Sequence, residues 1–169
     1  NYSVSLANSP SANITAKAIT MTVAISNKVY DGTVAASVSS TSLNGVETGD
    51  NVSIDGTKVS GVFADPDKAN TKTVTVTLAV GVLTGADATN YTVTVAAAPT
   101  ADITARAVTV TADNKTKQIN AADPATFTYT ITSGSLVARL GVAEQFTGSL
   151  TRAAGETAGT YAISNNNLA

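Results

Sequence analysis

The chain has 169 residues, a formal net charge of −2 at pH 7 and a pI near 4.9, and only 13% of its residues are charged. It has no run of Lys or Arg, so neither nucleic acid nor an anionic lipid surface is expected as a partner. His and Cys are absent, which excludes disulfides, thiol nucleophiles and the commonest general base, and the apolar stretches are too short to insert into a membrane.

Segments in which apolar residues alternate with hydroxyl residues follow one another along the chain. This alternation has the period of a half-buried strand, with Val, Ile or Leu inward and Thr outward. The clearest examples are residues 19–25, 72–80, 91–95 and 107–112. Turn-forming pairs of Asp, Asn, Gly and Pro separate these segments. The pattern predicts an all-β protein with short strands, and a β-sandwich is the expected architecture.

No stretch shows the apolar stripe of a helix that is eleven or more residues long. Residues 137–146 are the one place where we expect room for a single helical turn.

The beginning of the chain is repeated in its middle. The segment that starts at Asn1 (NYSVSLANSPSANITAKAIT) returns, with conservative changes, in the segment that starts at Asn90 (NYTVTVAAAPTADITARAVT). At the other end, Ala169 stands where the next Asn-Tyr pair is due. We interpret the chain as one period of a tandem array cut out of phase with its domains. Repeat arrays are normally spacers, fibres or binding scaffolds, and they are seldom enzymes.

The repeat predicts the domain boundaries. The segments around Ile14 and Ile103 are each expected to be the last strand of one domain and to run directly into the first strand of the next. Residues 1–16 would then be the final hairpin of a preceding repeat, or a donor strand segment. Residues 17–105 would be one complete sandwich, and residues 106–169 a second that lacks its last strands. Because almost no linker separates the domains, we expect a stiff array.

Two kinds of array are compatible with these boundaries. In a covalent array, successive repeats belong to one long polypeptide. In a polymer of separate subunits, the first residues of one copy would insert as a donor strand into the incomplete domain of the next, with Val4, Leu6 and Ile14 as its inward residues. The covalent array is the preferred interpretation, since repeats usually propagate along one chain.

The residues of the first domain resemble those of a known family. Lys28-Val-Tyr-Asp-Gly-Thr33 is similar to the signature of the YDG domain, which occurs in repeats of large bacterial surface proteins. The similarity extends through residues 61–67, 72–76 and 83–91.

The following residues resemble the MBG module, an immunoglobulin-like repeat that follows or alternates with the YDG domain. The matching stretches are residues 112–117, 123–124, 127–136, 146–152 and 155–163. Gln118-Ile119 departs from the Tyr-Gly of that pattern, and residues 143–145 depart from its Gly-Asp. The two resemblances imply tandem immunoglobulin-like domains of a bacterial extracellular adhesin or stalk, secreted or on the cell surface, with no enzymatic activity and no cofactor.

The most conspicuous polar group is Tyr30-Asp31-Gly32. As a functional site it would contact a sugar hydroxyl through Tyr30 and Asp31. As a structural motif, Gly32 would supply a special backbone angle while Asp31 caps the turn, and we prefer this interpretation. We also expect Asn90 and Tyr91 to be structural, with the tyrosine anchoring a final hairpin.

Acidic residues offer possible calcium ligands at Asp65 with Asp67, at Asp50 or Asp55 near Glu47, and at Asp87. None has the spacing of a calcium-binding loop, and turn formation explains them all, so no metal site is predicted. A Lys–Asn cross-link promoted by a buried acid is a further possibility that the sequence alone does not favour.

The expected function is mechanical, with neighbouring copies of the repeat as head-to-tail partners. The alternative is a module that binds carbohydrate or a host surface, with surface glycans as partners. Such a module needs exposed aromatic side chains that act together. Tyr30, Phe127, Tyr129 and Phe146 are the candidates, and we expect them to be buried.

Overall fold

The computed structural model describes residues 1–5, 8 and 10–169. Its described part is all-β, as predicted. The strands are β1 (Lys17–Ile25), β2 (Lys28–Val29), β3 (Ala35–Ala36), β4 (Val38–Asn44), β5 (Ser53–Ile54), β6 (Val59–Phe63), β7 (Ala69–Leu78), β8 (Leu83–Thr84), β9 (Tyr91–Val95), β10 (Thr100–Thr104), β11 (Thr109–Ala112), β12 (Tyr129–Ser133), β13 (Ala138–Arg139), β14 (Val142–Ala143), β15 (Ser149–Arg152) and β16 (Ile163–Asn166). Two 3₁₀ turns, Gly56–Lys58 and Ala88–Asn90, complete the elements. Among the described residues, no helix has the length and apolarity needed to cross a membrane.

The alternation in the sequence is realised as a buried and an exposed face. In β1, Ile19, Met21 and Val23 are buried, whereas the intervening Thr22 and Ala24 are exposed. Successive side chains of a strand point to opposite faces, so a Val-Thr alternation places apolar groups in the core and hydroxyls in water.

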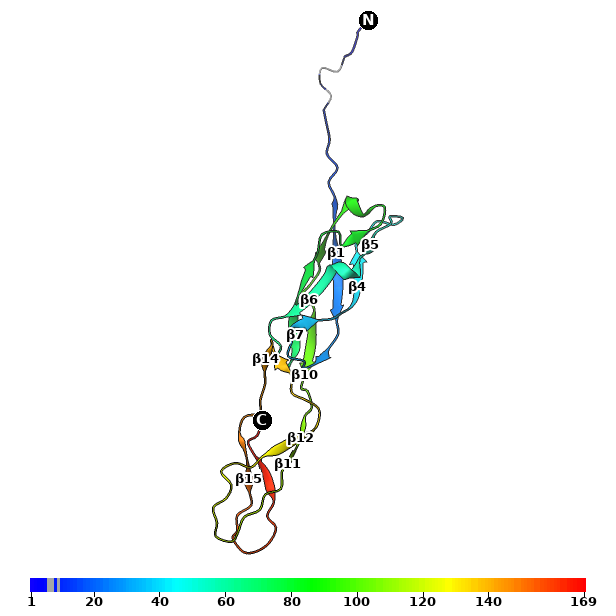
Figure 1. The fold of residues 1–169 in the computed structure, drawn as a ribbon. Coiled ribbons are helices and arrows are strands. Elements are labelled where there is room, and N and C mark those ends of the chain that lie inside the picture. Colours follow the sequence, from blue (N-terminus) through cyan, green and yellow to red (C-terminus); the bar gives the residue numbers. More distant parts are fainter. Residues whose placement is uncertain (6–7, 9) are drawn as a thin grey trace. The chain divides into compact units, whose positions relative to one another are not determined.

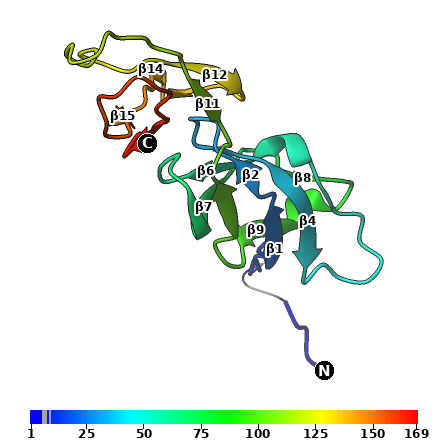
Figure 2. The ribbon, with the colours of Figure 1, turned by 90° about the horizontal axis from the view of Figure 1, so that it is seen from below.

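Two sheets supply the core formed by residues 17–104 (Figure 1). One has the order β4-β1-β9, in which β1 pairs antiparallel with β4 and parallel with β9. The other has the order β2-β10-β7-β6-β3. Figure 2 shows β6 and β7 in a different layer from β1 and β4. Met21 of the first sheet and Val59 of the second belong to one buried cluster, as the two layers of a sandwich require.

The chain divides into two compact units that are interleaved in sequence. The first contains Asn1–Ser26, Ala35–Phe63 and Thr73–Ala101. The second contains Asn27–Val34, Ala64–Lys72 and Asp102–Ala169. Two short segments from the first half of the chain therefore belong to the second unit, and no periodicity in the sequence indicates this.

The second unit holds three two-stranded ladders in its C-terminal part: β11 with β12, β13 with β14, and β15 with β16, all antiparallel. The expectation of a helical turn at residues 137–146 is wrong, because this segment forms the β13–β14 hairpin. Leu140 (φ 50°) and Gly141 (φ 86°) join its strands, and two successive positive φ angles are the geometry of a two-residue hairpin turn.

The strand pairing of the first domain recurs in the second with the spacing of the sequence repeat. Each position corresponds to the one 89 residues further along, as Asn1 corresponds to Asn90. The pair Phe63–Val74 of β6–β7 thus corresponds to the pair Arg152–Ile163 of β15–β16. The β15–β16 ladder therefore keeps the register of β6–β7 at the spacing of the sequence repeat.

The first pair of the β1–β4 ladder and the glycine turn after β4 also recur 89 residues later, whereas the remaining pairs of β11–β12 are displaced by one residue at an irregularity between Thr109 and Val110. The pair Thr20–Asn44 of β1–β4 corresponds to the pair Thr109–Ser133 of β11–β12. Both ladders end at a glycine with positive φ, which is residue 45 in the first domain and residue 134 in the second.

Candidate functional site

The turn after β2 is held by the side chain of Asp31. Its Oδ1 accepts hydrogen bonds from the amide and the hydroxyl of Thr33, both at 2.9 Å, and from Lys28 Nζ at 2.8 Å. Burial alone would raise the pKa of Asp31, but the hydrogen bonds from Lys28 and Thr33 outweigh it and hold the pKa below its usual value. All the donors are local, so the carboxylate serves the turn, as the structural interpretation predicts.

Residues of the same turn also contact the β13–β14 hairpin within the second unit. Tyr30 Oη donates to Glu144 Oε1 at 2.8 Å, and the amide of Leu140 donates to the carbonyl of Gly32 at 2.8 Å. Burial, followed by the hydrogen bond to Glu144, raises the pKa of Tyr30. Gly32 is buried with φ 76°, as the structural interpretation expected of this position.

Tyr91 is buried and Asn90 is exposed in the preceding 3₁₀ turn. The hydroxyl of Tyr91 donates to Asp50 Oδ2 and accepts from the amide of Glu47 at 3.2 Å. The hydrogen bond to Asp50 raises the pKa of Tyr91. These contacts give Tyr91 a structural role in the first unit and assign none to the Asn90 side chain.

The residues predicted to form the inter-repeat strand are fully exposed where the structure describes them. Val4 is 95% exposed and Ile14 is 103% exposed, as is the neighbouring Tyr2 at 100%. Leu6 lies outside the described residues. The structure therefore buries neither Val4 nor Ile14.

The acidic residues considered for calcium have other partners. Asp65 pairs with Lys72, and Asp67 pairs with Arg139 through two bonds of 3.0 and 2.9 Å. Hydrogen bonds from Lys72 and Arg139, respectively, lower the pKa of each carboxylate. Within the described residues, no three carboxylates converge as a metal site would need.

Of the remaining carboxylates of that group, Glu47 pairs with Lys17, and the others accept hydrogen bonds from main-chain or hydroxyl donors. Asp55 caps a 3₁₀ turn by accepting from Thr57, and Asp87 Oδ2 accepts from the amide of Asn51 at 2.8 Å. The ammonium groups of Lys72 and Lys117 contact carboxylates and main-chain carbonyls. This is the pattern of ion pairing, and it places no Asn side chain on either lysine.

The aromatic side chains proposed as a binding platform are half-buried, whereas we expected them buried. They are Tyr30, Phe127, Tyr129 and Phe146. Tyr129 and Phe146 pack edge to face with ring centroids 5.9 Å apart.

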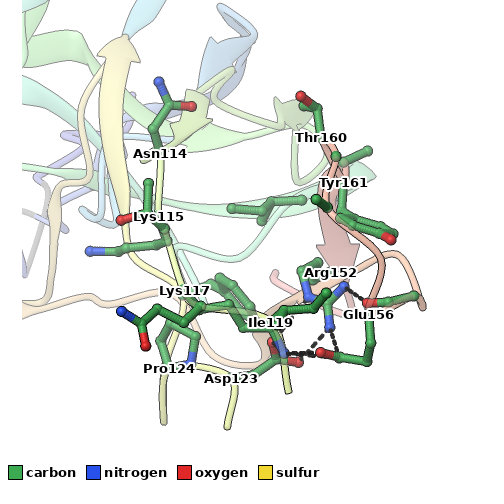
Figure 3. Close-up of a pocket in the computed structure, with 18 of the residues that line it drawn as sticks. Asn114, Lys115, Lys117, Ile119, Asp123, Pro124, Arg152, Glu156, Thr160 and Tyr161 are labelled. Carbon is green, nitrogen blue, oxygen red and sulfur yellow. Dashed lines mark hydrogen bonds and ion pairs between the residues drawn. The ribbon is translucent and has the colours of Figure 1, made fainter. Parts of the chain in front are cut away.

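A cavity of about 810 Å³ in the second unit is the site that sequence reasoning missed. Figure 3 shows Asn114 and Lys115 on one wall and Thr160 and Tyr161 on the opposite wall. Phe127 also lines it, so part of the surface is apolar. The ten buried hydrophobic residues of the described chain all lie between residues 19 and 103, so residues 104–169 contribute none of them.

Four charged side chains close one end of this cavity (Figure 3). Lys117 Nζ lies 3.1 Å from Asp123 Oδ1 and 2.8 Å from Glu156 Oε2, while Arg152 reaches the same two carboxylates at 3.0 and 2.9 Å. Hydrogen bonds from Arg152 and from Lys117, respectively, lower the pKa of Asp123 and of Glu156. The network ties the segment before β12 to the loop after β15.

Replacing Lys117 with Gln is expected to lower the melting temperature of the chain by a few degrees, because both carboxylates lose a hydrogen-bonded cation. Lys115→Gln is the matched control, since it removes the same charge from the wall of the same cavity without touching the network. Calorimetry at pH 7 measures the difference. Equal melting temperatures for the two variants would show that the network contributes no stability.

The pH dependence of unfolding provides a separate prediction. The pKa values of Asp123 and Glu156 lie below their ordinary values of 3.8 and 4.5, so both groups bind protons more readily in the unfolded chain. Their contribution to stability is therefore complete above about pH 5 and is lost as the pH falls through the folded pKa values. Between pH 5 and pH 3, we expect the melting temperature of Lys117→Gln to fall less steeply than that of the wild type. Parallel curves of melting temperature against pH for the two proteins would contradict this.

A smaller cavity of about 390 Å³ lies elsewhere in the second unit. Arg106, Val108, Leu136 and Phe146 contribute to its lining. Asp67, Lys68 and Glu144 also line it, so charged and apolar side chains share this cavity.

The described residues define an all-β protein of two compact units, the second of which holds a cavity lined by both polar and apolar side chains. Comparison with family models matches residues 15–101 to the YDG domain and residues 108–169 to the MBG domain (YGX type). The chain belongs to the YDG domain family, with an MBG domain following in the predicted order. Neither a comparison with curated proteins nor one with solved structures found a match.

Proposed function

We propose that this chain is a structural repeat of a bacterial extracellular adhesin stalk or filament, in which copies stack head to tail. The observation that carries the proposal is the internal repeat. The register of β6–β7 recurs 89 residues later in β15–β16, and the sequence of residues 1–16 repeats that of residues 90–105, with Tyr2, Val4 and Ile14 exposed. A unit of this kind finds its partners in further copies of itself.

The polar residues support a mechanical role. Asp31 and Asp55 cap turns, Asp50 holds Tyr91, and Asp67 holds Arg139, so the conspicuous carboxylates are engaged in maintaining the fold. The function proposed here needs no catalytic residue and no cofactor.

Membership in the YDG family supports a location outside the bacterial cell, either secreted or attached to the surface. The low charge and the many hydroxyl side chains are compatible with that location. The proposed partners are neighbouring copies of the repeat.

Antibodies raised against the chain test the proposed location. They are expected to label intact producing cells, or filaments shed from them, as strongly as they label lysed cells. Labelling that appears only after lysis would overturn the proposal.

The mass of the native material after denaturation in detergent distinguishes the two forms of assembly. A species near 16.9 kDa would indicate separate subunits, whereas only very large species would indicate a covalent array. Either mass is compatible with a structural repeat. The measurement tests the sequence-based preference for a covalent array.

A further inference from the structure

The sequence contains one Asn-Gly pair and two Asp-Gly pairs, which are Asn44-Gly45, Asp31-Gly32 and Asp55-Gly56. In such a pair the glycine nitrogen can attack Cγ of the preceding side chain, because glycine has no Cβ to hinder the approach. With asparagine, the new C–N bond closes a five-membered succinimide ring, and the side-chain amide leaves as ammonia with the proton of the attacking nitrogen. Water then opens either carbonyl of the ring and leaves aspartate or isoaspartate.

The structure restrains the side chains of both Asp-Gly pairs. Asp31 Oδ1 accepts hydrogen bonds from Lys28 and Thr33. Asp55 Oδ1 accepts the hydroxyl and the amide of Thr57, at 2.6 and 3.0 Å. These bonds hold each carboxylate in the turn that it caps. Both groups are also ionised at neutral pH, and a carboxylate is a poor electrophile. Neither Asp-Gly pair is therefore set up for ring closure in the folded chain.

The Asn44 side chain has no comparable restraint. It is exposed, and it has no hydrogen-bond partner among the described residues. Asn27 differs, because its side chain exchanges hydrogen bonds with the side chain and the amide of Asp102. The carboxamide of Asn44 is therefore free to turn toward the nitrogen of the next residue.

Asn44 also stands where the sheet opens most easily. It is the last residue of β4, and its pair with Thr20 is the last of the β1–β4 ladder. β4 is at the edge of its sheet in the order β4-β1-β9. Ring closure requires rotation of the extended strand backbone at Asn44, and the end of an edge strand opens at little cost in free energy. Opening of one pair is enough to permit the attack.

The turn after β4 requires the glycine but not the asparagine. Gly45 has φ 100°, a backbone angle that residues with a Cβ adopt only with strain. The counterpart of this pair in the sequence repeat is Ser133-Gly134, where the glycine keeps a positive φ and serine replaces asparagine. Serine has no carboxamide, so Asn44→Ser removes the reactive group and retains the turn.

We propose that Asn44 is a site of spontaneous covalent modification, at which the folded chain converts asparagine to aspartate and isoaspartate with water as the only co-reactant. The fold selects this site, because it leaves Asn44 free at a strand end and restrains both Asp-Gly pairs. This inference is independent of the proposed stalk function.

The modification changes the charge of one face of the first sheet. In the paired register, Asn44, Thr20 and Thr94 lie in one row of that face, and Ser42 and Thr22 lie in the next. The other paired positions of the face are Ala18, Ala24, Ser40 and Thr92. Conversion of Asn44 therefore places a negative charge on a face whose paired positions carry none. Isoaspartate also adds a methylene group to the main chain, which displaces Gly45 along the turn.

Peptide mapping by mass spectrometry tests the site. The full-length chain is kept folded at neutral pH, and samples are digested after increasing times. We expect the peptide with Asn44 to gain the mass difference between an amide and an acid before any other asparagine peptide does. The exposed Asn70, which precedes Thr71, is the internal control. Conversion of Asn44 no faster than that of Asn70 would overturn the proposal.

Two variants of Asn44 test the change of charge. On isoelectric focusing, aged wild-type protein is expected to develop a more acidic band that migrates with freshly prepared Asn44→Asp. Asn44→Ser is expected to remain a single band over the same time. An acidic band of equal intensity in aged Asn44→Ser would overturn the assignment to this residue.

The role of the fold is tested by comparing folded and urea-unfolded chains with an isoaspartate-specific methyltransferase, followed by mapping of the labelled peptides. The folded chain is expected to acquire isoaspartate at Asn44, whereas the unfolded chain acquires it at Asn44, Asp31 and Asp55. Isoaspartate that forms at either aspartate as fast as at Asn44 in the folded chain would overturn the proposed selection. Conversion of Asn44 confined to the unfolded chain would overturn reaction at the strand end.

Discussion

Met21→Ala is expected to destabilise the first unit by about 2–5 kcal/mol, the usual cost of removing a large side chain from a packed core. Met21 is wholly buried in the centre of β1, in one cluster with Val23, Val59 and Val82. The cluster joins both sheets, so the cavity left by the truncation weakens the contact between the two layers. Urea unfolding followed by circular dichroism measures the change in the free energy of unfolding.

The adjacent Thr22→Ala variant is the control, because Thr22 is exposed on the opposite face of the same strand. It is expected to change the free energy of unfolding by about 0.5 kcal/mol or less. Similar losses for the two variants would show that β1 does not contribute its apolar face to a sandwich core.

Gly32→Ala is expected to cost about 2–4 kcal/mol in the second unit, through backbone strain and steric overlap together. Gly32 has φ 76°, and a methyl group at this position would overlap the carbonyl oxygen of Ala138. Since a main-chain oxygen cannot move aside alone, the turn would have to separate from the β13–β14 hairpin. Thermal unfolding would measure the loss, and the amide NMR signal of Leu140, which bonds the Gly32 carbonyl, would report the separation.

Gly81→Ala separates these two effects. Gly81 has nearly the same backbone angle, φ 79°, but no atom lies within 4 Å of the position of an added methyl group. It is expected to cost about 1 kcal/mol, from the backbone angle alone. A loss at Gly32 no larger than that at Gly81 would show that contact with the hairpin contributes nothing.

The strands could be predicted from the sequence because their signal is local. In β1 and β9, alternation of Val or Ile with Thr decides which side chains face the core, and neighbouring residues alone set that period. Residues 137–146 were less informative. A two-residue turn at Leu140–Gly141 makes a hairpin from strands too short to show any alternation.

The roles of the Tyr30-Asp31-Gly32 motif were only partly predictable. Capping of the turn by Asp31 is a local effect and follows from residue type. The bond from Tyr30 to Glu144 joins residues far apart in sequence, as does the pairing of Asp67 with Arg139. Nothing in the composition or spacing of the chain marks those partners.

By itself, the sequence determined the all-β class, the order of the two domains and the existence of a repeat, since each depends on residue pattern and spacing along the chain. Only the tertiary structure decided that β15–β16 keeps the register of β6–β7 and which segments line the cavity of the second unit. A cavity is defined by walls that distant segments provide, here residues 114–119 and 155–163. The exposure of Ile14 is notable only because its counterpart in the sequence repeat, Ile103, is buried.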